Sequence, residues 1–152
     1  MYADGTHGIT KDEVTAAFWL RTSADQGNAL AQYRLALFHS VGLGGVERSE
    51  ARAVELYRLS ADQGYSLAQN NLGTYYFNGT GGLTKNVATA SELFHKAAAQ
   101  GNDAAAFNLG LVYEYGGDGV AKNLDEAQKW YRTAANMGYQ KAQQALTRLG
   151  VK

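Results

Sequence analysis

Small and hydrophobic residues recur along this chain at helical spacing, and the recurrence itself has a period of 37 residues. Ala68, Leu72 and Tyr76 lie four residues apart, which places them on one face of a helix. After a glycine-rich loop, every repeat has a second stripe of the same spacing. This stripe is Ala16, Trp19, Leu20 and Ala24 in the first unit and Ala53, Leu56, Tyr57 and Ala61 in the next. The pattern therefore predicts two helices in each repeat.

Three complete repeats align without a gap, and each end of the chain holds part of another repeat. The complete repeats are residues 31–67, 68–104 and 105–141. Residues 142–152 begin a fourth copy, as a half-repeat or a capping helix. Residues 1–30 form a partial first repeat that lacks most of its first helix, because MYADGTHGITKDE aligns with VYEYGGDGVAKNL. We expect one solenoid domain over residues 1–152, cut from a longer array; the alternative is a natural chain with a degenerate first repeat.

Polar residues and glycines mark the helix boundaries at the same place in each repeat. Good N-cap residues stand where each second helix begins: Asp12, Ser49, Asn86 and Asn123. Glu126 lies three residues after Asn123, which is close to a capping box. Glycines suited to a C′ residue end these helices: Gly27, Gly64, Gly101 and Gly138. Gly73 and Gly110 lie inside first helices, where we expect a neighbouring helix to approach closely.

The third repeat, AAFNLGLVYEYGGDGVAKNLDEAQKWYRTAANMG, resembles the Sel-one-like repeat (SLR), a relative of the tetratricopeptide repeat. The resemblance covers essentially the whole chain, although the period is longer than that of the tetratricopeptide repeat and proline is absent. It implies an all-α fold, a right-handed α–α superhelix of helix-turn-helix repeats, that acts as a scaffold for contacts between proteins. The family does not fix one function.

Charge and composition exclude several classes of partner. The chain has 14 Lys and Arg and 14 Asp and Glu residues, so no net charge attracts nucleic acid or an anionic membrane. It has no cysteine for disulfides or thiolate metal sites. No apolar stretch approaches the length of a membrane span, and the N-terminus has no signal-peptide pattern. We expect no nucleic-acid partner and no membrane insertion, and we assign no localisation.

Residues that could support catalysis, a metal or a cofactor do not gather in any one unit. His7, His39 and His95 share neither a repeat nor a helical face, and His39 occupies a core column. The carboxylates that could meet a cation are better explained as loop and helix-start residues: Asp118, Asp125 and Glu126. The loop GTGGLTK has part of the composition of a P-loop without its spacing or its preceding strand. We therefore expect no enzyme, no cofactor and no metal site.

The concave face is where a ligand is expected, because the first helices of stacked two-helix repeats line it. Opposite the stripe of Leu72 and Tyr76, these helices carry aromatic residues with asparagines between them. Rings supply apolar contact, and an asparagine can pair with both the N–H and the C=O of an extended peptide. The candidate groove residues are Tyr33, Leu37, Asn70, Thr74, Phe77, Asn78, Phe107, Leu111, Glu114, Tyr115 and Arg148. The alternative is that these side chains are buried between helices of a tight superhelix.

The sequence favours a non-enzymatic adaptor that binds a peptide or protein segment in this concave groove. One alternative is a structural spacer in a longer array, or a segment that associates end to end with another copy. Self-association would use the helix of Trp19 and Leu20, which is only half covered when its partner helix is missing. The other alternative is a regulatory arm of a larger enzyme.

Overall fold

Pairs of packed helices make up residues 11–151, the part of the chain that the computed structural model describes. No strand occurs in that range, which holds one isolated β-bridge between Gly117 and Val120. The prediction of an all-α repeat fold is therefore confirmed. In chain order, the helices are α1 (Lys11–Asp25), α2 (Ala29–Val41), α3 (Glu50–Asp62), α4 (Ser66–Asn78), α5 (Val87–Ala99), α6 (Asp103–Tyr115), α7 (Leu124–Asn136) and α8 (Gln140–Arg148).

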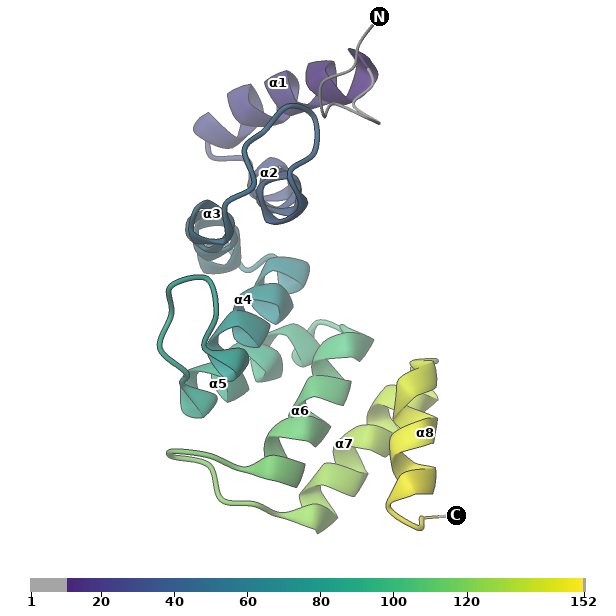
Figure 1. Cartoon of the computed structure of the whole chain (residues 1–152). Coiled ribbons are helices and arrows are strands. Elements are labelled where there is room, and N and C mark those ends of the chain that lie inside the picture. The colour runs from purple at the N-terminus through teal and green to yellow at the C-terminus, as the bar shows by residue number, and fades with distance from the viewer. Residues whose placement is uncertain (1–10, 152) are drawn as a thin grey trace, which may run out of the picture.

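The helices stack into an arc that runs from one end of the chain to the other (Figure 1). Each complete repeat supplies a first helix (α2, α4 or α6) and a second helix (α3, α5 or α7), each of 13 residues. Helix α1 corresponds to a second helix and α8 to a first helix. The first helices lie toward the inner side of the arc, and α3 and α5 lie toward its outer side (Figure 1).

Side-chain caps begin three of the second helices, as predicted. Ser49, Asn86 and Asn123 each accept a hydrogen bond from the backbone N–H three residues further on. The prediction for Asp12 is wrong, because α1 already includes Lys11 and so Asp12 lies in the first turn. A carboxylate there still favours the helix, since the N-terminal end of the helix dipole is positive.

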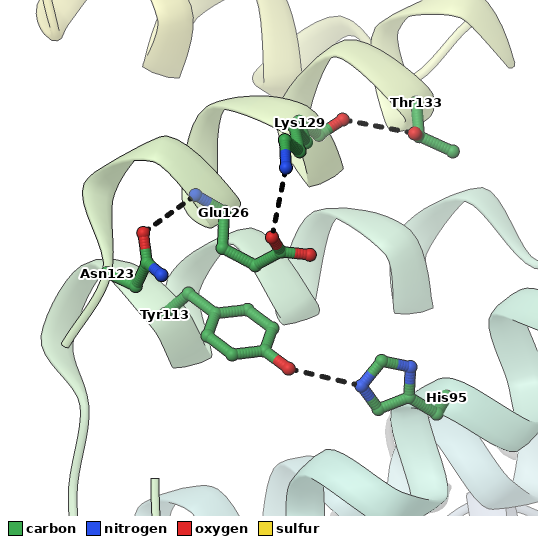
Figure 2. A network of polar contacts seen from close by, with 6 residues as sticks. All are labelled: His95, Tyr113, Asn123, Glu126, Lys129 and Thr133. Atoms are coloured by element: carbon green, nitrogen blue, oxygen red, sulfur yellow. Dashed lines mark hydrogen bonds and ion pairs between the residues drawn. The ribbon is translucent and has the colours of Figure 1, made fainter. Parts of the chain in front are cut away.

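Only half of the expected capping box forms at the start of α7. Asn123 Oδ1 accepts from the Glu126 N–H at 3.0 Å, but the Glu126 carboxylate lies 3.5 Å from Lys129 Nζ (Figure 2). The Asn123 N–H donates instead to the Tyr113 carbonyl oxygen at 2.8 Å. The reciprocal bond of a capping box is absent because its donor is already used by the preceding first helix.

Glycines end the second helices in the predicted left-handed conformation. Their φ angles are 88° at Gly27, 86° at Gly64, 87° at Gly101 and 95° at Gly138. A residue with a Cβ is strained at such angles, which explains the recurrence of glycine.

Large aromatic residues of the second helices pack directly onto small residues of the first helices. A Cβ added at Gly73 would lie 2.6 Å from the Phe94 ring, and one added at Gly110 would lie 2.3 Å from the Tyr131 ring. Ala36 is fully buried in the same column of the first complete repeat. The prediction that these glycines permit a close helix approach is therefore confirmed.

Glutamine side chains link the first and second helices of a repeat inside the stack, a feature that the sequence analysis did not anticipate. Gln32 is buried and accepts from Gln63 Nε2 at 2.7 Å. Gln69 repeats the contact one repeat later, accepting from Gln100 at 2.9 Å. The ladder stops at the third repeat, where the equivalent residue is Ala106.

Candidate functional site

The predicted groove residues lie on the first helices α2, α4 and α6 and on α8, which ends the stack (Figure 1). Their role in binding a ligand stays a prediction. Tyr115 is the most exposed of the four aromatic side chains among the candidate groove residues, at 63%. The other three are half-buried: Tyr33, Phe77 and Phe107.

Ring pairs hold the half-buried aromatic residues in place. The ring centroid of Tyr33 lies 5.9 Å from that of Tyr57 and 5.2 Å from that of Tyr65. Two repeats further on, Phe107 is held in the same way, between the rings of Tyr131 and Tyr139. These side chains therefore offer an edge or part of a face to a ligand rather than a free ring.

Polar side chains of α4 and α6 face one another across the inner side. Asn108 Nδ2 donates to Asn70 Oδ1 at 2.9 Å, which leaves the amide N–H groups of Asn70 outside this bond. Thr74 is exposed, and its hydroxyl donates to the Asn70 carbonyl oxygen at 3.1 Å. Nearby, Asn78 is exposed and Phe77 lies beneath Lys85 Nζ, 5.7 Å from its ring centroid. Acceptors and donors thus alternate with partly exposed rings along α4.

Glu114 differs from its neighbours in the row because it is buried and fully engaged. Arg148 donates to both of its carboxylate oxygens, at 2.6 and 2.8 Å, and Tyr131 donates from its hydroxyl at 2.5 Å. Hydrogen bonding to Arg148 lowers the pKa of Glu114 below its ordinary value, against the effect of burial. Burial, together with the bond to Glu114, raises the pKa of Tyr131. This network joins α8 to the third repeat, so Glu114 and Arg148 hold the end of the solenoid together.

Two cavities open beside the predicted row, and each includes one of its residues. A cavity of about 340 Å³ between α3 and α4, the hydroxyl-lined cavity, is formed by Glu50, Tyr57, Asn71, Thr74, Tyr75 and Thr80. A cavity of about 520 Å³ between α1 and α2, the apolar cavity, is formed by Ala16, Trp19, Leu20, Arg34, Leu37 and Phe38. Leu37 and Thr74 occupy the same column one repeat apart, so the two cavities are successive along the inner side.

The sequence analysis selected Asn70, which faces α6, and missed Asn71, which faces α2 and α3. The Asn71 side chain lies beside the hydroxyls of Tyr33 and Tyr57, which belong to the preceding repeat. Burial raises the pKa of both tyrosines, and the Asn71 amide opposes the rise. The hydroxyls therefore stay protonated and can donate. An alignment of the repeats contains a signal for Asn71, because an asparagine recurs one repeat later as Asn108. In the same alignment an aromatic residue recurs at the position of Tyr57, as Phe94.

His95, on α5, contacts side chains of α6 and α7 and is not arranged as a metal ligand. Its Nε2 lies 3.4 Å from the Tyr113 hydroxyl (Figure 2), and its ring meets that of Trp130 edge-on at 5.2 Å. Burial lowers the pKa of His95, which favours the neutral ring. Arg58 makes the equivalent contact one repeat earlier, with the Tyr76 hydroxyl at 3.2 Å. The column thus has a structural use in both repeats.

Metal and membrane features are absent from the part of the chain that the structure describes. No group of three or more His, Asp or Glu side chains there could hold a metal ion. His39 is half-buried, with its Nδ1 3.0 Å from the Glu47 carbonyl oxygen, while His7 lies outside the described residues. None of the helices between residues 11 and 151 is long and apolar enough to cross a membrane.

Comparison with known proteins identifies a repeat family. A family model described as Sel1 repeat matches residues 1–28, 29–65, 66–102 and 103–139. No curated protein matches the chain. The crystal structure of a protective antigen of uropathogenic Escherichia coli with an SLR fold is similar, with 38% identity and a TM-score of 0.81 over 90% of this chain. A Sel1 repeat protein from Oxalobacter formigenes shares 30% identity, with a TM-score of 0.83 over 93% of this chain. The chain spans 28% of the length of the first protein and 56% of the second.

Proposed function

The chain belongs to the Sel1 repeat family, and from that premise we propose that it is an adaptor that binds an extended peptide segment along α2, α4 and α6. Members of this family generally act as scaffolds for interactions between proteins and are typically not enzymes. The observation that carries the proposal is the pair of successive cavities beside the first helices, one apolar and one hydroxyl-lined. Their repeat spacing suits a segment whose side chains enter both.

The chemistry of the inner side supports an extended peptide over a folded domain. The tyrosine and asparagine groups are fixed by contacts within the fold, so little side-chain entropy is lost when they bind. Asn70 has N–H donors directed away from its bond with Asn108, and exposed Asn78 adds an amide. Such groups can satisfy the backbone of a segment that has no secondary structure of its own.

Selection of linear peptides tests this proposal. Panning a phage-displayed library of random linear peptides against the chain is expected to yield binders, whose affinities fluorescence anisotropy then measures. Changing Thr74 to Arg together with Tyr115 to Ala is expected to weaken binding about tenfold or more, because central contacts dominate peptide affinity. Both side chains are exposed, so the fold should tolerate the changes.

A matched control places the same number of changes on the second helices. Lys96→Ala with Arg132→Ala alters two exposed side chains and is expected to leave peptide affinity within about twofold of the wild type. Circular dichroism verifies that both variants are folded. Equal loss of affinity in the two variants, or binders that tolerate the groove changes, would contradict the proposal.

A second candidate function, self-association through α1, is favoured by the exposure of this helix. Val14, Phe18 and Trp19 are 48%, 61% and 62% exposed, and Phe18 and Trp19 contact each other edge-on at 5.5 Å. Charged residues occupy the column of Phe18 in the complete repeats: Glu55, Glu92 and Lys129. An apolar side chain there suits contact with a second copy better than contact with water.

Sedimentation velocity over a range of concentrations tests the second candidate. The wild-type chain is expected to sediment faster as its concentration rises, and Phe18→Glu is expected to stay monomeric because it restores a charge to that column. The matched control, Leu59→Glu, introduces the same charge at another exposed apolar residue, on α3. A wild-type chain that remains monomeric throughout would rule out this function without affecting the adaptor proposal.

A further inference from the structure

The hydroxyl-lined cavity between α3 and α4 differs in chemistry from its counterpart between α5 and α6. Glu50 and Tyr75 line it, whereas the same columns carry Val87 and Val112 at the junction of α5 and α6. Thr74 is replaced there by Leu111. The polar lining of this cavity is therefore set by its own side chains and is not a consequence of the repeat geometry.

A carboxylate and two aromatic rings converge on the cavity. The ring centroids of Tyr57 and Tyr75 lie 5.9 Å apart, with their planes inclined by 40°. Glu50 is exposed at the first residue of α3, and no ion pair is found for it within residues 11–151. A carboxylate beside aromatic faces is the combination that recognises a cationic side chain, because both attract positive charge.

We propose that this cavity is the subsite for a lysine or arginine side chain of the segment bound along the first helices. The aliphatic stem would pack against Tyr57 and Tyr75, and the charged head would meet Glu50. The amide of Asn71 and the hydroxyls of Thr74 and Thr80 supply acceptors for its remaining N–H groups. The inference rests on the proposed function, since it names the chemistry of one residue in the bound segment.

The nearby Arg48 does not cancel this preference. Arg48 is not among the residues that line the cavity. Burial raises the pKa of Tyr75 most strongly; Glu50 raises it further, and Arg48 lowers it to a smaller extent. The carboxylate therefore acts more strongly than the guanidinium on the hydroxyl that borders the cavity.

Small-molecule probes test the subsite without a known partner. The probes are N-acetyl-arginine amide and its uncharged counterpart N-acetyl-citrulline amide, titrated into the ¹⁵N-labelled chain and followed by ¹H–¹⁵N correlation spectra. The arginine probe is expected to shift the backbone amide signals of Thr74, Tyr75 and Thr80 in a saturable way. The citrulline probe is expected to bind at least about tenfold more weakly, because it lacks the charge that pairs with Glu50.

Variants of two glutamates complete the test. Glu50→Gln is expected to lower the affinity for the arginine probe about tenfold, to the level of the citrulline probe. Glu92→Gln makes the same change on an exposed side chain of α5 and is expected to leave that affinity unchanged. Equal affinity of the two probes, or an arginine affinity that survives Glu50→Gln in a folded chain, would overturn the subsite.

The outcome is distinguishable from failure of the adaptor proposal. If selected peptides bind the groove but the arginine probe does not depend on Glu50, the adaptor function stands and the subsite is wrong. If no peptide binds the groove while the arginine probe shows the expected dependence, the cavity still recognises cations but the adaptor function falls.

Discussion

Replacing Glu114 with alanine is expected to lower the free energy of unfolding by about 2–4 kcal/mol. The substitution leaves the Tyr131 hydroxyl buried without its acceptor, and it removes the group that holds Arg148 to the third repeat. It also opens a space where a buried side chain stood. Urea titration followed by circular dichroism measures the change.

The matched control is Glu114→Gln, which keeps an oxygen for Tyr131 but removes the charge that pairs with Arg148. We expect a smaller loss, because the Arg148 side chain is 52% exposed and solvent weakens its ion pair. A loss as large as that of the alanine variant would show that the charge, and not the acceptor for Tyr131, dominates. No loss in either variant would contradict the role assigned to the network.

The contribution of Glu114 also depends on pH with a definite sign. Its pKa in the folded chain is lowered, so the folded state binds a proton less readily than the unfolded state does. The stabilisation is therefore present above the unfolded pKa and is lost as the pH falls through the folded pKa. The difference in stability between the wild type and Glu114→Gln should accordingly shrink on acidification from about pH 7 to about pH 3.

Replacing Gly110 with alanine is expected to destabilise the chain by about 1–3 kcal/mol, although alanine is the better helix former. The new Cβ would lie 2.3 Å from the Tyr131 ring, a distance that requires the buried ring or the helices to shift. The loss from this overpacking exceeds the gain in helix propensity, which is about 1 kcal/mol. Urea titration again measures the effect.

Ala36→Gly is the reverse change in the same column and serves as the control. It is also expected to destabilise, because it removes a fully buried methyl group and adds a glycine to a helix. If Gly110→Ala stabilised the chain, the close approach of α6 and α7 would be wrong. If Gly110→Ala and Ala36→Gly both destabilise the chain, the size of the residue at each position is set by the second-helix side chain that packs against it and not by its position in the repeat.

The sequence alone predicted the helices, most of their caps and their glycines, because these features depend on residues close together in the chain. The φ angle of 86° at position 64 is by itself enough to explain why that residue is glycine. Ser49 accepts a hydrogen bond from a backbone N–H only three residues away. Asp12 was assigned wrongly because the alignment with Ser49 could not show that α1 already includes Lys11.

The inner face was harder to predict, because its exposure depends on contacts between repeats. Glu114 looks like a groove residue in sequence, yet Arg148, 34 residues further on, engages it in a buried network. Tyr33 is half covered by Tyr65 of its own repeat, a contact that no helical stripe reveals. Asn71 was missed because one residue of helix rotation turns it from the side of α6 to that of α2.

The central claim is that a peptide segment binds along the first helices. The most direct test is to add a selected peptide to the ¹⁵N-labelled chain and map the changes in the ¹H–¹⁵N spectrum. The account predicts the largest changes at the amides of Leu37, Thr74 and Leu111, with little change at exposed second-helix residues such as Leu59 and Lys96. Changes confined to the second helices, or to α1, would contradict it.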